Sequence, residues 1–436
     1  MYVAFDDTDS VTSMCTTFLA TEVVRALSDH DLIGYPRLVR LNPSVPWKTR
    51  GNGALCLRFG KGSGASSVIG QIGDLKVRSH RRSLGDPDQD ELMERCSRLL
   101  RLWSRTQEDA SPGLVVSPSP PSPRLYWRTV REVVPKEEVM EELRRIGASA
   151  LELSGGRGVI GASAAMAWRP RDRTYEVLAY RAKERWGTPR QVMPQDVERL
   201  DARFPSTFNN YDHVARRPAI VPHSPCPILF GIRGDDVSEL PEAMRSVSSE
   251  PVDRWLLFMS NQGTDDHIVR RWRELRPWSS YRVEGEVVRA PATIPGGHVI
   301  LRLRTKAGEV DCAAYEPSKE FRGVVRQLVP GDLLVAFGEL RERPRTLNLE
   351  KIEVVALAEH RRKVSNPACP DCGKAMGSMG RGGWYRCKRC GRKAQGGERT
   401  ELVPRAIEEG WYEPPVRARR HISMPLKRQL ARGLRS

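Results

Sequence analysis

Residues 2–10 have the sequence YVAFDDTDS, and the rest of the chain is organised around them. The run YVAF predicts a short strand, because aromatic and β-branched residues favour strands. It leads into Asp6, Asp7 and Asp9, and the apolar spacing from Met14 to Leu27 predicts a helix. Carboxylates at a strand end suit Mg²⁺ and helix-start amides suit phosphate, so the stretch indicates phosphoryl transfer. The alternative is a polar turn that only caps the helix.

The composition predicts a protein of several domains that binds a polyanion. The chain has 436 residues, enough for about two to four domains. Its formal net charge of +17 favours nucleic acid as a partner. We expect no transmembrane helix, because no apolar run reaches about 18 residues, and no signal peptide. Four of the nine cysteines are paired closely, which is typical of a metal site in a reducing cytosol, so a cytoplasmic protein is expected.

Two later segments combine glycines with cations. Residues 42–53, NPSVPWKTRGNG, separate predicted strands at 38–41 and 55–59, and residues 154–165, SGGRGVIGASAA, lead into a run of small residues with helical character. Both fit phosphate or nucleotide binding, because glycines let backbone amides approach a phosphate and cations neutralise it. The alternatives are an ordinary hairpin loop with a solvated basic tip and simple close packing of small residues.

The middle of the chain predicts mixed helices and strands. The run from Ser117 to Pro123 should be extended or mobile. Polar residues gather where the strands near 230 and 257 end, which is a site-like arrangement, whereas His267 alone indicates a structural role. We expect helices over 92–103, 137–146 and near Ala243, and strands over 114–116, 125–127, 174–180, 227–235 and 255–259.

From Tyr281 onward the pattern becomes all-β. Five short strands in about 75 residues predict a small Greek-key barrel of the OB type, a common binder of single strands. Any half-exposed small barrel gives a similar pattern. The expected strands are 283–288, 298–303, 310–315, 332–340 and 347–355, and the expected binding face carries Arg282, Arg289, Arg302 and Arg304.

The strongest single motif is a pair of CxxC knuckles, Cys369–Cys372 and Cys387–Cys390, fourteen residues apart. Four thiolates close a tetrahedral Zn²⁺ site, so a structural zinc ribbon is predicted. The surrounding cations and aromatics favour contact with nucleic acid over a merely solvated charge run. The basic tail from Val416 to Ser436 is expected either to order only on RNA or to be a disordered end.

These residues together resemble the archaeal tRNA(Ile) 2-agmatinylcytidine synthetase (TiaS) family nearly end to end. The resemblance is carried by five features: the acidic run with Met14-Cys15-Thr16-Thr17, the loop 42–53, the segment 157–162, the run 260–265, and the order barrel then zinc ribbon. It implies a multidomain α+β fold. The implied parts are an N-terminal α/β kinase-like domain (1–130, its end lying between 130 and 190), a ferredoxin-like domain (131–275), an OB-fold β-barrel (280–358), a zinc ribbon (364–397) and a basic tail (398–436).

The resemblance also implies an ATP-dependent ligase. The family joins agmatine to carbon 2 of the wobble cytidine in the CAU-anticodon isoleucine tRNA, releasing AMP and phosphates. The cytosine carbonyl has no leaving group, and phosphorylating its oxygen creates one. The implied cofactors are ATP, Mg²⁺ and structural Zn²⁺, and the implied partners are tRNA and agmatine, with no membrane and no obligate protein partner.

By that similarity each candidate residue takes a role. The catalytic set is Asp6, Asp7, Asp9, Thr16 as the autophosphorylated threonine, Lys48 and Arg50. The nucleotide-binding set is Asp7, Thr8, Asp9, Gly51, Asn52, Gly53, Arg157 and Gly158. The carboxylates proposed for agmatine are Asp212, Asp235 and Asp265, and the zinc ligands are Cys369, Cys372, Cys387 and Cys390.

Two other functions remain open at the level of sequence. The first is a non-enzymatic single-stranded nucleic-acid-binding protein built from an OB-fold and a zinc ribbon, which leaves the acidic run and the glycine-rich turns without a role. The second is a related ATP-dependent RNA enzyme that adds another amine, such as lysine. ATP turnover and competition between amines distinguish the three.

Overall fold

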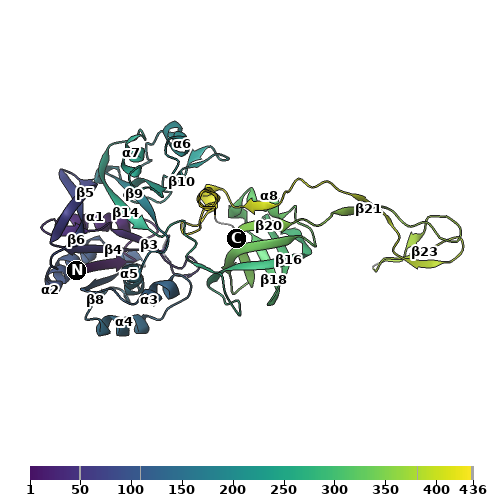
Figure 1. Ribbon diagram of the computed structural model, residues 1–436, viewed down its shortest axis with the longest axis horizontal. Helices are drawn as coiled ribbons and strands as arrows, with labels where there is room; N and C mark the ends of the chain where they lie inside the picture. Colours follow the sequence, from purple (N-terminus) through teal and green to yellow (C-terminus); the bar gives the residue numbers. More distant parts are fainter. Residues whose placement is uncertain (49–50, 109, 381, 434–436) are drawn as a thin grey trace.

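The computed structural model describes residues 1–48, 51–108, 110–380 and 382–433. Figure 1 shows an N-terminal α/β body, a β-barrel beside it, and an arm that extends away from the barrel and carries the zinc-ribbon strands. The chain then returns to the region between the barrel and the N-terminal body. No helix in the described ranges is long and apolar enough to cross a membrane.

One twelve-stranded sheet runs through the N-terminal body. Its path is β10-β13-β9-β14-β5-β6-β2-β4-β1-β7-β8, and β3 pairs with both β14 and β4. The residues before and after position 130 therefore share one sheet, since β7 pairs with β8. The strands are β1 (Tyr2–Asp6), β2 (Asp31–Ile33), β3 (Arg37–Arg40), β4 (Gly53–Gly60), β5 (Gly62–Ile72), β6 (Leu75–Ser83), β7 (Gly113–Ser117), β8 (Ser149–Glu152), β9 (Thr174–Arg181), β10 (Thr207–Phe208), β13 (Ile228–Gly234) and β14 (Val252–Ser260).

Helices cover both faces of the N-terminal part of this sheet. In β1, Val3 and Phe5 join the core that contains α1 and α2, whereas Ala4 joins the core of α3, α4 and α5. Burial on both faces explains the unbroken apolar run in the sequence. The helices are α1 (Thr16–Ala26), α2 (Gln89–Trp103), α3 (Pro123–Thr129), α4 (Lys136–Arg145), α5 (Gly158–Ala167), α6 (Pro194–Arg203) and α7 (Leu240–Arg245), with 3₁₀ turns η1 (Thr106–Glu108) and η2 (Lys183–Arg185).

One local prediction is wrong, and one hairpin was not predicted. Residues 125–127 lie in helix α3 and not in a strand, because Ser122 accepts a hydrogen bond from the Arg124 amide and Pro123 occupies the first turn. The β5–β6 hairpin was not predicted, because its charged second strand is largely exposed and lacks a run of apolar residues.

The predicted five-stranded barrel is confirmed. β16, β17, β18, β20 and β19 pair in that order, and β16 also pairs with β19, which closes the ring. His267 is structural as expected, being buried and 2.9 Å from a carboxylate oxygen of Glu350. The elements here are β15 (Ile268–Val269), β16 (Ser279–Ile294), β17 (His298–Thr305), β18 (Gly308–Ala314), η3 (Glu316–Ser318), α8 (Phe321–Val325), β19 (Leu333–Leu340), β20 (Thr346–Ala356) and β26 (Gly410–Tyr412).

The arm consists of a two-stranded stalk and a small three-stranded sheet (Figure 1). The stalk pairs β21 (Arg361–Ser365) with β25 (Arg399–Leu402), and the sheet contains β22 (Gly377–Ser378), β23 (Trp384–Arg386) and β24 (Lys393–Gln395). The hydrophobic core of the three-stranded sheet is limited to a few residues around the cysteines. So small a core needs a metal or another cross-link for stability.

The basic tail is ordered between residues 416 and 433, which corrects the expectation of a segment that orders only on RNA or stays disordered. We call residues 416–433 the C-terminal strap; it contains η4 (Val416–Ala418) and α9 (Leu426–Ala431). Arg428, 1% exposed, forms ion pairs with Asp172 and Asp235 of the N-terminal body. Lys351 of the barrel hydrogen-bonds the Met424 carbonyl at 3.0 Å. Within residues 416–433 each cation pairs with a carboxylate: Arg417, Arg419, Arg420, Lys427, Arg428 and Arg432.

Candidate active site

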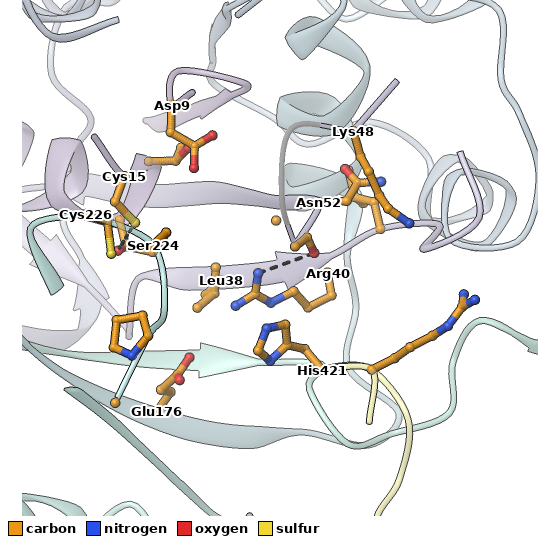
Figure 2. Close-up of a pocket in the computed structure, with 18 of the residues that line it drawn as sticks. Asp9, Cys15, Leu38, Arg40, Lys48, Asn52, Glu176, Ser224, Cys226 and His421 are labelled. Atoms are coloured by element: carbon orange, nitrogen blue, oxygen red, sulfur yellow. Dashed lines mark hydrogen bonds between the residues drawn. The ribbon is translucent and has the colours of Figure 1, made fainter. Parts of the chain in front are cut away.

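A cavity of about 470 Å³ lies where the N-terminal sheet, its loops and the C-terminal strap meet. Its lining comes from segments that are far apart in sequence: the acidic loop and the start of α1, the loop 38–53, the start of α5, strands β9 and β13, and residues 416–421 of the strap. Figure 2 shows Asp9 at one side of this space and Arg40, Glu176 and His421 at the other. We call the side with Asp6, Asp7 and Asp9 the acidic wall, and the opposite side, which carries Arg40 and Arg233 together with Glu176, the cationic wall.

The acidic wall is made by Asp6, Asp7 and Asp9, which the structure brings together as predicted. Asp7 has a φ of 57°, a left-handed turn that redirects the chain at the end of β1. Asp6 accepts a hydrogen bond from the Asp7 amide at 2.7 Å, and Asp7 accepts one from the Ser111 amide at 3.1 Å. Burial, together with the neighbouring Asp7 and Asp9 charges, raises the pKa of Asp6 well above its ordinary value. A bound cation would relieve this repulsion.

Thr16 is the first residue of α1 and lines the cavity. The Thr8 hydroxyl donates to the Thr16 hydroxyl oxygen at 3.2 Å, which fixes the Thr16 side chain next to the acidic loop. Thr17 also lines the cavity, with its hydroxyl 3.0 Å from the Cys15 sulfur. The predicted juxtaposition of carboxylates and a helix-start hydroxyl is therefore present.

The glycines at the start of α5 serve close packing. A Cβ on Gly161 would collide with an Asp6 carboxylate oxygen, and one on Gly158 would lie 2.5 Å from the Asp6 carbonyl oxygen. The Gly158 amide donates to the Ser111 carbonyl at 2.8 Å, so this helix start offers space rather than a free donor at Gly158. Arg157 lines the cavity, with its guanidinium 5.3 Å from the ring centre of Trp47.

The predicted loop 42–53 also reaches the cavity. Lys48, Gly51, Asn52 and Gly53 line it, whereas Arg50 lies outside the described residues. Asn52 donates from its side chain to the Asn42 carbonyl at 2.8 Å, which closes the loop. Lys48 donates to the Pro43 carbonyl, and burial, with the nearby Arg420 charge, lowers its pKa.

The cationic wall was missed by sequence reasoning. Arg40 lies at the end of β3; its side chain contacts the Gln262 amide oxygen at 3.3 Å and the Gly51 carbonyl at 3.4 Å. Arg233 of β13 pairs with Glu176 of β9 at 3.0 Å. The only sequence signal was the position of Arg40, a cation at the end of an otherwise apolar strand leading into the basic loop.

The run 260–265 positions this wall. Asn261 accepts a hydrogen bond from the Arg40 amide at 2.6 Å and donates to the Arg40 carbonyl at 2.8 Å. Gln262 donates to Glu176 at 2.6 Å while it accepts from Arg40. These two amide side chains therefore hold the end of β3 against β14, and their role is positioning.

The three carboxylates expected to bind agmatine are not brought together. Asp212 lines the cavity and pairs with Arg417 of the strap at 2.6 Å. Asp235 pairs with Arg428 and Asp265 with Lys351, and neither aspartate lines the cavity. Position at a strand end could not tell an aspartate that lines the cavity from one that anchors another part of the chain. The cations that pair with these aspartates lie in the barrel and the strap, far away in sequence.

The four ribbon cysteines converge as predicted, with sulfur-to-sulfur distances of 3.4, 3.5 and 3.9 Å among them. A tetrahedral Zn²⁺ with bonds of about 2.3 Å sets sulfurs about 3.8 Å apart. The donor set and its spacing therefore fit zinc. With four protein ligands the ion would be structural.

The fold and cavity define a multidomain α+β protein with a closed five-stranded barrel and a four-cysteine zinc-ribbon site. Family models match three stretches of the chain: the TiaS TCKD domain at residues 2–155, the TiaS FLD domain at 156–267, and the TiaS C-terminal zinc ribbon domain at 366–407. The chain belongs to the TiaS family.

Curated relatives and solved structures are similar over nearly the full length. Proteins named as TiaS, the 2-agmatinylcytidine synthetase of isoleucine tRNA, are 38% identical in Archaeoglobus fulgidus, covering 99% of this chain and 98% of the relative, and 34% identical in Methanocaldococcus jannaschii, covering 98% of each. A solved complex of TiaS with isoleucine tRNA and ATP aligns with a TM-score of 0.82 at 36% identity, covering 98% of this chain and 97% of that chain. A second complex, of TiaS with isoleucine tRNA, AMPCPP and agmatine, aligns with a TM-score of 0.79 at 34% identity, covering 98% and 96%.

Proposed function

We propose that this chain is the ATP-dependent ligase that conjugates agmatine to carbon 2 of the wobble cytidine of the CAU-anticodon isoleucine tRNA, giving 2-agmatinylcytidine, AMP and phosphates. The observation that carries the proposal is the cavity in which an acidic loop and a helix-start hydroxyl face a cationic wall, in a member of the TiaS family. Relatives of this length carry that name and were solved with tRNA, ATP and agmatine.

Asp6, Asp7 and Asp9 would hold Mg²⁺, since hard carboxylate oxygens are its preferred protein ligands. When bound, the ion would neutralise charge on the phosphates and on the crowded carboxylates. Gly51, Asn52, Gly53 and Arg157 line the cavity and would contact the nucleotide, with Gly158 providing space. Thr8, predicted for the same role, is buried behind the lining and would act by positioning Thr16. Lys48 and Arg50 are assigned to the charge that develops on the transferring phosphoryl group.

Two chemical steps follow from the substrate. The cytosine carbonyl oxygen is first phosphorylated, which turns it into a leaving group. The agmatine amine then forms the carbon–nitrogen bond at carbon 2 and loses a proton, while the carbon–oxygen bond breaks and phosphate departs. Thr16, at the start of α1, is the residue that becomes phosphorylated during turnover. It takes the second phosphoryl group of ATP, which leaves AMP, and hydrolysis of the phosphothreonine releases the second phosphate. Asp212 remains our candidate for a cationic group of agmatine, because it alone of the three predicted carboxylates lines the cavity.

We assign a kinase-like fold to the first part of the N-terminal body and a ferredoxin-like fold to the second. The division falls within residues 130–190, and the junction of the two matched family regions at 155 and 156 supports it. The barrel is assigned as an OB-fold, and the arm as an RNA contact because its exposed surface carries Lys388, Arg389 and Arg392. A purely nucleic-acid-binding protein is not favoured, because it gives the cavity no task.

The direct test incubates the full chain with ATP, labelled agmatine and two transcripts of the isoleucine tRNA that differ only in having C or U at the wobble position. Label should enter only the transcript with C, with AMP formed in step, and excess lysine should not compete. Thr16→Ala should abolish incorporation while tRNA binding survives, and Thr16→Ser is the matched control. Incorporation that is independent of the wobble base, or normal in Thr16→Ala, would overturn the proposal.

A further inference from the structure

The C-terminal strap is fixed to both neighbouring bodies immediately around His421. Toward the N-terminal body, the His421 carbonyl accepts from the Gly263 amide at 2.9 Å, and the Ile422 carbonyl accepts from the Asp265 amide at 3.0 Å. Toward the barrel, Arg420 pairs with Glu339 and Glu350. The backbone at position 421 is therefore held by contacts that do not involve its own side chain.

The His421 imidazole projects into the cavity. The residue is exposed to solvent through the cavity. Within the described ranges its ring nitrogens have no hydrogen-bond partner in the protein. The ring lies next to the loop glycine Gly51, where an added Cβ would be 3.3 Å from the His421 Cδ2 atom. Figure 2 shows the ring beside the Arg40 guanidinium.

The charges around His421 favour an anion. Arg40 has no carboxylate partner at ion-pair distance in the part of the chain that the structure describes, whereas Arg233 is paired with Glu176. The neighbouring Arg420 is likewise paired within the barrel. Glu176 and Asp9 offset part of the Arg40 charge. At the His421 ring, however, the nearby charges are those of the two cations Arg40 and Arg233, so the ring lies at a positive potential that an anion would neutralise.

We propose that His421 and Arg40 form a phosphoryl-binding subsite, in which the strap supplies a hydrogen-bond donor to a phosphoryl group that the acidic wall approaches from the opposite side. The subsite rests on the proposed function and deepens it. The phosphoryl group is that of ATP or of the phosphorylated cytidine, and a backbone phosphate of tRNA is the competing source. No covalent step at His421 is involved.

The protonation state of His421 provides a measurable sign that a phosphoryl group is bound. Desolvation by the surrounding protein, with the nearby Arg40 and Arg233 charges, lowers its pKa well below the ordinary value, so the ring is neutral when no anion is bound. A phosphate dianion between His421 and Arg40 reverses the sign of the local potential and raises that pKa. Binding should therefore be accompanied by proton uptake at this one ring.

The test is NMR of the full chain labelled with [ε1-¹³C]histidine, titrated in pH with and without inorganic pyrophosphate. His421→Gln assigns the signal, and His30→Gln, which does not line the cavity, is the matched control. We expect the His421 pKa to rise by at least one unit with pyrophosphate and to stay unchanged with the CAU-anticodon stem-loop alone. No shift with pyrophosphate would overturn the subsite, and a shift with the stem-loop alone would assign it to the RNA backbone instead.

Kinetics separate this subsite from the overall function. His421→Ala should raise the KM for ATP or lower kcat by roughly 10- to 100-fold, the loss expected for a hydrogen bond to a charged group, with His421→Gln in part restoring it. tRNA binding and the thermal midpoint should match those of His30→Gln. If the wild type incorporates agmatine and His421→Ala does so at the same rate, the subsite is refuted and the proposed function stands. If the wild type incorporates no agmatine but its His421 pKa still rises with pyrophosphate, only the proposed reaction is refuted.

Discussion

The zinc ribbon and the cavity are built in opposite ways. The ribbon's ligands span only residues 369–390, and its small sheet spans residues 377–395. The cavity takes its walls from the first twenty residues, the middle of the chain and the C-terminal strap. The spacing of residues in the sequence predicts a local site of this kind completely. For a site assembled from distant segments, the sequence predicts only those segments that match a motif. The following predictions test that contrast, from the largest expected effect to the smallest.

Zinc removal should affect the ribbon and leave the cavity intact. A structural Zn²⁺ contributes on the order of 10 kcal/mol to the fold of so small a unit. Chelation of the metal, or Cys372→Ser, should therefore unfold the arm between β21 and β25 while nucleotide binding persists. Limited proteolysis with mass spectrometry gives the cleavage sites, and Cys312→Ser is the control. Loss of ATP binding upon chelation would contradict the independence of the two regions.

Asp7→Asn should disable the cavity without affecting the arm. The substitution keeps the side-chain shape but removes a charge from the proposed Mg²⁺ site, and we expect agmatine incorporation to fall about 10³-fold or more. Filter binding should show unchanged affinity for tRNA. Asp90→Asn, at the exposed start of α2, is the matched control. Normal agmatine incorporation by Asp7→Asn would show that the acidic wall takes no part in the reaction.

Arg428→Ala should release the strap. It leaves Asp172 and Asp235 without their most buried partner, and breaking such a pair costs about 3 kcal/mol. Hydrogen exchange should rise across residues 416–433, and incorporation should fall because His421 loses its position. Arg432→Ala removes contacts to the same carboxylates from a side chain that is 37% exposed, so its cost should stay below about 1 kcal/mol. Equal effects of the two variants would show that burial of Arg428 does not anchor the strap.

The smallest effect concerns Asp266, whose environment only tertiary packing creates. Burial raises its pKa from 3.8 to about 6, although the Tyr126 hydroxyl donates to it at 2.6 Å. A carboxyl with a raised pKa in the folded state stabilises the fold fully below pH 3.8 and loses that contribution as pH rises through 6. Relative to Asp266→Asn, the wild type should lose roughly 2 kcal/mol between about pH 4 and pH 7. Urea unfolding across this range is the measurement, and parallel curves would contradict the prediction.

Much of the fold could be predicted from local patterns. The strands of the barrel, helices α1, α2, α4 and α5, and the zinc ligands follow from periodicity and spacing that a few consecutive residues carry. The errors have local causes too: Pro123 begins a helix where apolar residues suggested a strand, and the charged β5–β6 hairpin has no apolar signature. The boundary between the first two domains was predicted between 130 and 190, and composition could not place it more closely. Strand pairing across position 130, as between β7 and β8, leaves no mark on composition.

The sequence by itself determined that Asp6, Asp7 and Asp9 follow a strand and precede a helix, and that four cysteines can close around zinc. It could do so because each set lies within a short stretch of chain, so that local backbone geometry fixes how close its side chains can come. Only the tertiary structure decided that Arg40 and His421 face those aspartates, and that Asp235 and Asp265 serve the strap and not the cavity. The reason is that an aspartate gives the same local sequence pattern whether its carboxylate binds a ligand or pairs with a distant residue. Asp235 pairs with Arg428, which lies 193 positions further along the chain.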